Sequence, residues 1–178
     1  SQLTGLRPDL TILDLRGNVD TRLRKLEEGE FDAIILAGAG LHRLGKTDRI
    51  TSLLTPDQML PAIGQGALGI ELRKTDTDLL DGLQFLHHRP TALAVTAERA
   101  FLLRLEGGCQ VPIGAYATLS GDQITLTGLI AAVDGSLILK EQTTGPAGKA
   151  TALGTTLAEI LLAKGGKAIL DAVYCSDS

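Results

Sequence analysis

The stretch Leu105-Glu-Gly-Gly-Cys-Gln-Val-Pro-Ile-Gly114 is the point at which the sequence changes from a helical pattern to a strand pattern. An apolar helical pattern precedes it and is stopped by Gly107 and Gly108. A strand pattern begins directly after Pro112, which delays the start of the strand. The stretch also carries the thiol of Cys109. A cysteine that serves packing normally lies within an element among apolar neighbours, so a junction loop presents its sulfur to a ligand instead.

On both sides of this junction the chain predicts an α+β module. Upstream, Pro90 and Thr91 begin a helix through about residue 106. Its buried stripe is expected to consist of Leu93, Ala97, Ala100, Phe101 and Leu105. Downstream, three strand-like runs lie near residues 113–119, 123–133 and 136–144, separated by hairpin turns. Two helices follow near residues 150–164 and 167–173, split by Gly165-Gly166. We therefore expect a three-stranded antiparallel sheet with helices on one face.

The first third of the chain predicts an α/β arrangement. Residues 10–15 and 31–37 are expected to form strands, and the second is continuously apolar, as is typical of a buried parallel strand. Between them, Asn18 is expected to cap a helix over residues 19–28 that faces Leu23 and Leu26 inward and ends at Gly29. Further elements are expected by pattern alone: short helices near residues 37–45 and 50–54, a hinge over 61–66, a strand over 67–72 and a helix over 76–87.

Composition narrows the classes of function. The chain has 178 residues, of which 44% are hydrophobic and 21% charged, as in a folded soluble domain. Aromatic residues are only 3% and the net charge is −4, which argues against a nucleic-acid partner. No apolar run is long enough for a bilayer span, and no signal-peptide pattern is present. Two cysteines make no disulfide framework, so we expect a reducing, cytoplasmic compartment. The absence of an initial Met suggests a truncated, processed or split protein.

Basic side chains gather at the first strand-to-helix turn, where Arg16, Arg22, Arg24 and Lys25 outnumber Asp20. Arg16 follows the carboxyl end of a predicted strand, where open α/β sheets bind ligands. The guanidinium plane suits carboxylate or phosphate. Arg43 follows the next predicted strand, and we favour anion binding for it and for Arg16. Arg24 and Lys25 are interpreted as a solvated helix face paired with Glu27 and Glu28, and Arg22 stays open between the two roles.

Two further features point less clearly to chemistry. Gly38-Ala-Gly40 follows an apolar strand pattern, but a dinucleotide fingerprint would need a third glycine at Arg43. These small residues are interpreted as allowing close packing or the approach of an acidic ligand group. His87 and His88 diverge by about 100° if helical, and no ligand stands at metal-binding spacing, so no metal site is expected.

The residues alone leave three interpretations of Cys109. A catalytic nucleophile would need a histidine base, and His42, His87 and His88 are not marked as partners. An inert structural thiol would not need two preceding glycines. An attachment point for a covalent group needs an exposed and flexible approach, which glycines provide. From composition alone, the structural interpretation of Cys109 and the attachment interpretation are equally supported.

Taken together, several segments resemble porphobilinogen deaminase, also called hydroxymethylbilane synthase. The resemblance runs in order along nearly the whole chain. It is carried by Leu15-Arg-Gly-Asn-Val-Asp-Thr-Arg-Leu23, Phe31-Asp-Ala-Ile-Ile-Leu-Ala37, Ala39-Gly-Leu-His-Arg-Leu44, Ala62-Ile-Gly-Gln-Gly-Ala-Leu-Gly69, and Thr96-Ala-Glu-Arg-Ala100 through Leu105-Glu-Gly-Gly-Cys-Gln-Val-Pro112.

The resemblance implies a transferase of tetrapyrrole and heme biosynthesis. Enzymes of this family join four porphobilinogen molecules, with release of ammonia, into hydroxymethylbilane. They use a dipyrromethane cofactor held as a thioether on a loop cysteine, which corresponds here to Cys109. Family arginines that bind its acetate and propionate groups correspond to Arg16, Arg22 and Arg43. Gly40 and Gln65 are carried over as further cofactor-binding residues.

The resemblance also implies a domain organisation and a missing part. Residues 1–60 would belong to a second, periplasmic-binding-protein-like α/β domain, 61–88 to a hinge and a segment returning to the first domain, and 89–178 to the C-terminal α+β domain. Most of the first domain, with its catalytic aspartate, would be absent, and Asp14, Asp20 and Asp32 do not match it. We therefore expect no activity from this chain alone, and a monomer or a pairing with its N-terminal fragment. The alternative is a non-catalytic anion-binding α/β module with an unmodified Cys109.

Overall fold

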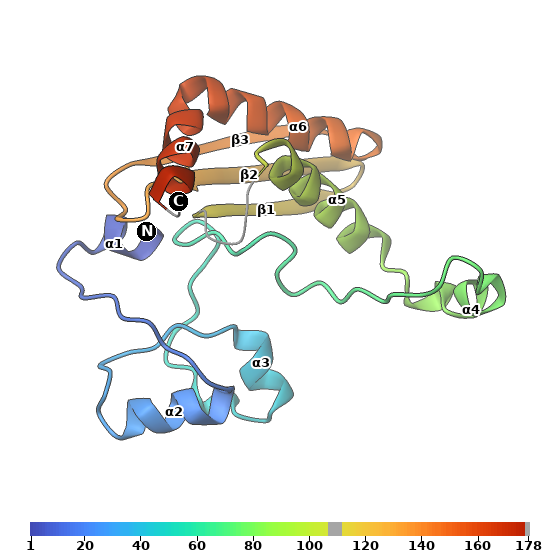
Figure 1. The fold of residues 1–178 in the computed structure, drawn as a ribbon. Helices are drawn as coiled ribbons and strands as arrows, with labels where there is room; N and C mark the ends of the chain where they lie inside the picture. The colour runs from blue at the N-terminus through green and yellow to red at the C-terminus, as the bar shows by residue number, and fades with distance from the viewer. Residues whose placement is uncertain (107–111, 177–178) are drawn as a thin grey trace. The chain divides into compact units, whose positions relative to one another are not determined.

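A computed structural model describes residues 1–106 and 112–176, and Figure 1 shows it as a ribbon. The chain divides into two compact units. We call Ser1–Pro8 together with Pro56–Ser178 the sheet unit, and Asp9–Thr55 the arginine unit.

The sheet unit is built on three antiparallel strands in the order β1-β2-β3. The strands are β1 (Ile113–Ser120), β2 (Gln123–Ala131) and β3 (Ile138–Pro146). Gly121 and Gly135 take φ values of +58° and +77° in the two connections, which L side chains rarely adopt. The predicted meander and both glycine turns are therefore confirmed.

Helices cover one face of this sheet, as Figure 1 shows. They are α5 (Arg89–Arg104), α6 (Ala150–Leu161) and α7 (Lys167–Ser176). The 3-10 turn η3 (Ala147–Lys149) precedes α6, and the segment η4 (Leu162–Gly166) joins α6 to α7 through a kink at Gly165, where φ is +105°. The predicted split between two C-terminal helices is confirmed. The fully buried side chains of the core are Phe101, Ile124, Leu126, Leu129, Ile130, Leu157 and Leu161.

The predicted apolar stripe of α5 faces this core. Ala97, Phe101 and Leu105 are buried, and Leu93 and Ala100 are half-buried. On the other face of the sheet, Leu60, Leu129 and Ala131 form a small separate cluster.

The sheet unit begins with a short helix, α1 (Gln2–Leu6). The Gln2 side chain donates a hydrogen bond from Nε2 to the carbonyl oxygen of Leu60, and its Oε1 accepts one from the Leu60 N–H, both at 2.8 Å. These paired bonds satisfy both backbone groups of a buried residue.

The arginine unit contains α2 (Val19–Glu27), α3 (Gly38–Arg43) and the 3-10 turn η1 (Thr47–Arg49). As predicted, Asn18 caps α2, because its Oδ1 accepts a hydrogen bond from the Thr21 N–H at 2.8 Å. Leu23 is buried and Leu26 half-buried on the inward face. Gly29 follows the helix with φ at +77°, so the predicted end is also confirmed.

The strands predicted at residues 10–15, 31–37 and 67–72 are wrong, because the structure pairs none of these segments with a partner. None of their apolar residues is buried, and Leu13 and Leu68 keep 61% and 89% of their surface exposed. An apolar run forms a strand only when a second strand satisfies its backbone groups. The α/β arrangement expected for the first third is therefore absent from the described residues.

Two predicted helices also differ from the structure. Residues 50–54 are not helical, and the chain instead makes η1 just before them. The helix predicted over residues 76–87 is shorter and broken, with α4 (Thr77–Gly82) followed by the 3-10 turn η2 (Gln84–Leu86). Gly82 interrupts the helical run, which is consistent with the low helix propensity of glycine.

Candidate anion-binding site

Arg16 and Arg22 lie at the start of α2 in the arginine unit. Arg16 is exposed and precedes Gly17, whose φ of +118° makes the turn into the helix. A Cβ at Gly17 would stand 2.9 Å from Thr21 Cγ2, so the turn requires glycine. The Arg22 Nε donates a hydrogen bond to the Gly17 carbonyl oxygen at 2.8 Å. This bond uses one of the five N–H donors of Arg22 and leaves its terminal nitrogens for a ligand.

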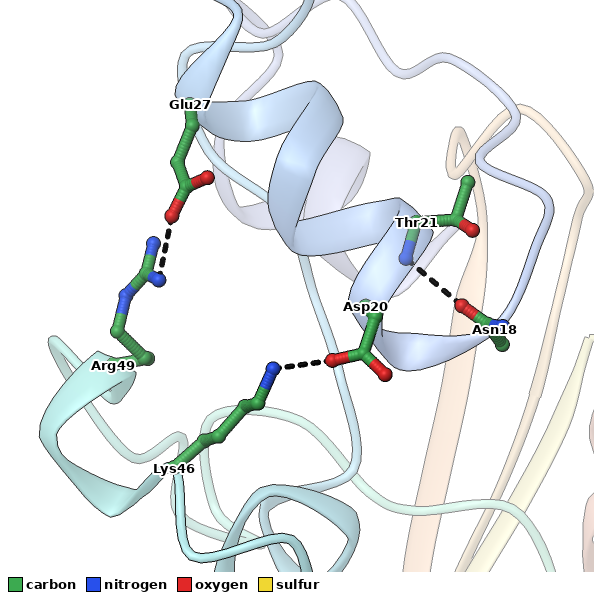
Figure 2. Close-up of polar contacts among 6 residues, drawn as sticks. All are labelled: Asn18, Asp20, Thr21, Glu27, Lys46 and Arg49. Carbon is green, nitrogen blue, oxygen red and sulfur yellow. Dashed lines mark hydrogen bonds and ion pairs between the residues drawn. The ribbon is translucent and has the colours of Figure 1, made fainter.

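Two ion pairs connect α2 to the segment that follows α3, and Figure 2 shows both. Lys46 pairs with Asp20 in the first turn of α2. Arg49 Nη1 lies 2.6 Å from Glu27 Oε1 at the other end of the helix. Exposed pairs contribute at most about 1 kcal/mol each, so their main consequence is for local charge.

The acidic side chains of α2 and of the residues just after it are all matched with cations other than the candidate arginines. Besides the two pairs in Figure 2, Arg24 Nε lies 3.7 Å from Glu28 Oε1 and Lys25 Nζ lies 3.4 Å from Glu30 Oε2. Arg24 and Lys25 therefore form the paired, solvated face that the sequence predicts, although Lys25 uses Glu30.

The guanidinium groups of Arg16 and Arg43 have no hydrogen-bond or ion-pair partner within residues 1–106 and 112–176, and Arg22 is bonded only to a carbonyl oxygen there. None of the acids in and just after α2 therefore forms an ion pair with these three arginines. Guanidinium groups bind carboxylates through strong, paired hydrogen bonds, so these three side chains have the right chemistry for a polycarboxylate.

Gly40 and Arg43 lie three residues apart on α3, and residues at this spacing share one side of a helix. A Cβ at Gly40 would stand 4.0 Å from Val19 Cγ2, which brings this side of α3 close to the first residue of α2. The structure therefore places Gly40 beside the helix that carries Arg22, and Arg43 exposed one turn further on.

Gln65 belongs to the sheet unit, at the centre of a tight double turn. The Gln65 N–H donates to the Ala62 carbonyl oxygen at 3.0 Å, and the Ala67 N–H donates to that of Gly64 at 3.1 Å. Gly64 and Gly66 take φ values of +69° and +83°, so the two glycines make the turn that leaves the Gln65 side chain exposed.

Cys109, the predicted attachment point, lies outside the described residues. Its flanks agree with the predicted helix-to-strand junction, because α5 ends at Arg104 and β1 begins at Ile113. Leu105 is buried at the end of the helix, and Glu106 has φ at +53°, a value that takes the chain out of the helical path.

Glu98 is a residue whose importance the sequence reasoning missed. Only 6% of its surface is exposed, and it is the single charged side chain that is buried in the described part of the chain. Its Oε2 accepts a hydrogen bond from the Gly64 N–H at 2.8 Å, and its Oε1 accepts one from the Ala117 N–H at 2.9 Å. Burial raises the pKa of the Glu98 carboxyl, and the two backbone hydrogen bonds oppose that rise. The sequence feature that could have indicated the burial of Glu98 is its position next to Ala97, on the apolar stripe of α5.

The histidines take local hydrogen bonds. His42 Nδ1 lies 3.1 Å from Thr47 Oγ1, and His88 Nδ1 lies 2.7 Å from Thr91 Oγ1. Over residues 1–106 and 112–176, no three His, Cys, Asp or Glu side chains gather as a metal ion would require. Among the described helices, none combines the length and the apolar character needed to cross a membrane.

The sheet unit also contains an open apolar hollow of about 780 Å³. Residues of the 63–72 segment, of α4 and η2, and of the exposed side of α5 line it, among them Gly64, Leu68, Leu86, Val95 and Leu102. A hollow with this apolar lining is typical of a surface that another segment covers.

Comparison with known proteins returns one family for both parts of the chain. Residues 1–81 match the family model described as porphobilinogen deaminase, dipyromethane cofactor binding domain. Residues 92–163 match the model described as porphobilinogen deaminase, C-terminal domain. Over 174 residues, 98% of the chain, it is 56% identical to a porphobilinogen deaminase of Trichlorobacter lovleyi and 55% identical to one of Geobacter sulfurreducens. The chain spans 56% and 55% of the length of these two relatives.

Proposed function

The chain belongs to the porphobilinogen deaminase family, and on that premise we propose that it is part of the transferase that joins four porphobilinogen molecules into hydroxymethylbilane with release of ammonia. The observation that carries the proposal is the charge pattern of the arginine unit. The acids in and just after α2 are paired with other cations, whereas Arg16, Arg22 and Arg43 keep donors for a ligand. Each pyrrole ring of the substrate and product carries two carboxylates, so a growing chain needs several such partners.

We propose that Cys109 holds the dipyrromethane cofactor through a thioether bond. Support comes from the position of Cys109 in the Leu105–Gly114 junction and from the description of the family model that matches residues 1–81. The described donors fit such a group, because its carboxylates need cations and the three arginines supply them. When bound, the dipyrromethane supplies the primer end to which the first porphobilinogen is joined.

Within this proposal, the chain's own residues bind and orient the cofactor. Arg16, Arg22 and Arg43 hold its acetate and propionate groups. Gly40, which has no side chain, allows an acidic group to approach the backbone of α3. Gln65 offers an exposed amide that both donates and accepts hydrogen bonds.

For the domain organisation, we propose that residues 1–60 belong to a periplasmic-binding-protein-like α/β domain, 61–88 to a hinge and returning segment, and 89–178 to the C-terminal α+β domain. The exposed apolar side chains along residues 10–15 and 31–37, and the open hollow beside residues 63–72, support this, because both need covering by further polypeptide. The partner we propose is the N-terminal part of the protein, in a monomeric cytoplasmic enzyme.

We also propose that this chain has no activity without that N-terminal part. Support comes from its span of 56% of the Trichlorobacter lovleyi relative and from the lack of a match for the family's catalytic aspartate among Asp14, Asp20 and Asp32. Without a positioned acid or base, proton transfer at the pyrroles would lose a factor of roughly 10² to 10⁴ in rate.

The deciding experiment is intact-mass measurement of the 178-residue chain after co-expression with the part of the Trichlorobacter lovleyi protein that lies outside the match. We expect an added mass equal to two linked pyrroles, mapped to the peptide that contains Cys109. Cys109→Ser should abolish the added mass, whereas the matched control Cys175→Ser should keep it. An unmodified chain in the complemented sample would overturn the cofactor proposal and favour the alternative, an anion-binding module with a free thiol.

The same samples test the activity. The complemented pair should consume porphobilinogen and release ammonia, and the chain alone should do neither. Robust turnover by the chain alone would contradict the proposed need for an N-terminal part.

A further inference from the structure

The carboxylate of Glu98 joins three separate segments of the sheet unit. It projects from the middle of α5, and its two oxygens accept hydrogen bonds from the backbone of Gly64 in the double turn and of Ala117 in β1. In the described part of the chain it has no ion-pair partner. The buried negative charge is therefore stabilised by backbone N–H groups from two places distant in sequence.

Such an arrangement is costly to bury and costly to disturb. A buried carboxylate loses its hydration, and it is retained where hydrogen bonds compensate for that loss. Hydrogen bonds to a charged group are shorter and stronger than neutral ones. Removal of the acceptor would also leave the Gly64 and Ala117 N–H groups without partners. Both bonds are therefore expected to persist together.

The hydrogen bond from the Gly64 N–H to Glu98 lies at the point where the chain leaves the core of the sheet unit and becomes exposed. Leu60 is held by the Gln2 side chain, and Ile63 packs against the main core. Beyond Gly66, Leu68 lies almost fully in solvent. The Gly64–Gly66 turn is thus attached to the core on its first side, and the chain is exposed from Leu68 onward to Ile70.

We propose that Glu98 is a positioning residue whose carboxylate fixes the Gly64–Gly66 turn on α5 and β1, and so determines where Gln65 is presented and where the hinge pivots. The fixing of the turn is a property of the sheet unit alone. The consequence for Gln65 rests on the proposed function, in which Gln65 contacts the cofactor.

The first test is backbone amide hydrogen exchange, followed by NMR on the ligand-free 178-residue chain. In Glu98→Gln the side-chain amide has one acceptor oxygen, so one of the two N–H groups loses its partner. We expect exchange at Gly64 or Ala117 to become about 10- to 100-fold faster, with Leu126 in β2 unchanged. Glu98→Asp keeps a charged pair of acceptors and should restore part of the protection. Glu159→Gln, an exposed glutamate on α6, is the matched control and should leave all three amides unchanged.

Two outcomes would overturn the fixing of the turn. One is exchange at wild-type rates for both Gly64 and Ala117 in Glu98→Gln. The other is an equal acceleration at Leu126, because it would show that Glu98 acts on global stability. If Glu98→Gln does not fold, Glu98→Asp decides the question: a partial loss of protection at Gly64 or Ala117 with Leu126 intact is then the supporting result, and wild-type exchange at both amides overturns the proposal.

The second test separates this proposal from the proposed function. In the chain co-expressed with the complementing N-terminal part, Glu98→Gln should lower the fraction of chain that carries the added dipyrrole mass. If Glu98 acts through Gln65, the decrease should be much smaller in a Gln65→Ala background, as a double-mutant cycle measures. Equal decreases in both backgrounds would overturn the link to Gln65. Absence of dipyrrole mass even in the wild type would overturn the proposed function and leave the hydrogen-exchange result standing.

Discussion

Gly154 of α6 lies directly against the backbone of α5, where a Cβ on Gly154 would stand 2.2 Å from the carbonyl oxygen of Ala97. The same Cβ would be 2.8 Å from Ala100 Cβ and 2.8 Å from the Phe101 nitrogen. The two helices that cover the sheet therefore approach each other at a point where only glycine fits. The close approach seals Phe101 and Leu157 into the core, where both are fully buried.

Substitution Gly154→Ala should destabilise the chain in spite of the higher helix propensity of alanine. Its methyl group would meet backbone atoms, which cannot rotate away, so we expect the free energy of unfolding to fall by about 1–3 kcal/mol. Urea denaturation measures the change. The control is Gly148→Ala, because a Cβ there meets no atom within 4 Å. Equal stability of the two variants would contradict the close approach.

Substitution Asn18→Ala should loosen the start of α2. The side chain of Asn18 satisfies the Thr21 N–H at the helix N-terminus, so its loss should cost about 1 kcal/mol in the arginine unit. The measurement is hydrogen exchange at the Thr21 amide. Asn18→Asp keeps the acceptor and should retain the protection. Unchanged exchange in the alanine variant would argue against the cap.

The stability of the chain should depend on pH through Glu98. Burial raises the pKa of this carboxyl above the ordinary 4.5, so the folded chain holds the proton more tightly than the unfolded chain does. The stabilisation from this group is therefore fully present below pH 4.5 and is lost as the pH rises through the raised value in the folded state. Glu98→Gln cannot titrate, so its stability relative to the wild type should increase between about pH 4 and pH 7.

Denaturation midpoints at several pH values measure this difference. The control Glu159→Gln changes an exposed glutamate that is paired with Arg104, and it should show no comparable trend. If the wild type instead gained on Glu98→Gln as the pH rose, the direction given for the Glu98 pKa would be wrong.

Arg43 should contribute to the binding of a pyrrole carboxylate. Its guanidinium has no partner within the described residues, so Arg43→Leu should remove a charge-assisted contact and weaken binding roughly tenfold. Calorimetric titration with a synthetic dipyrromethane that carries acetate and propionate groups measures the affinity. Arg24→Leu is the matched control, because Arg24 is exposed and paired with Glu28. Equal losses in the two variants would indicate a general charge effect and not a site at Arg43.

The elements that the sequence predicts correctly are those that find their partners nearby. The three strands of the sheet unit are joined by short glycine turns, so each strand pairs with its neighbour in sequence. Helix α2 carries its own cap and its own terminating glycine. The strands predicted at residues 10–15 and 31–37 fail because apolar character does not supply a pairing strand, and none of their side chains is buried.

In the candidate site, too, local features could be predicted from the sequence and contacts between distant residues could not. The positions of Arg16 and Arg43 predict anion binding and the family resemblance adds Arg22, but the sequence leaves open which cations are neutralised by the acids in and just after α2. The tertiary structure assigns those acids to Arg24, Lys25, Lys46 and Arg49. Lys46 and Arg49 lie more than twenty residues beyond the carboxylates they pair with, so their partners could not be read from local spacing.

By itself, the sequence determined the C-terminal meander, its covering helices and the cap and end of α2, because each depends on residue types and short spacings. The choice of Cys109 and of the arginines stays a prediction. Only the tertiary structure decided the contact of Gly154 with Ala97 and the burial of Glu98 between Gly64 and Ala117. Those relationships depend on which backbone atoms meet across distant segments. Residue types and spacings do not show which distant segments come into contact. A glycine or glutamate on an exposed helix has the same sequence pattern as one that is buried between segments.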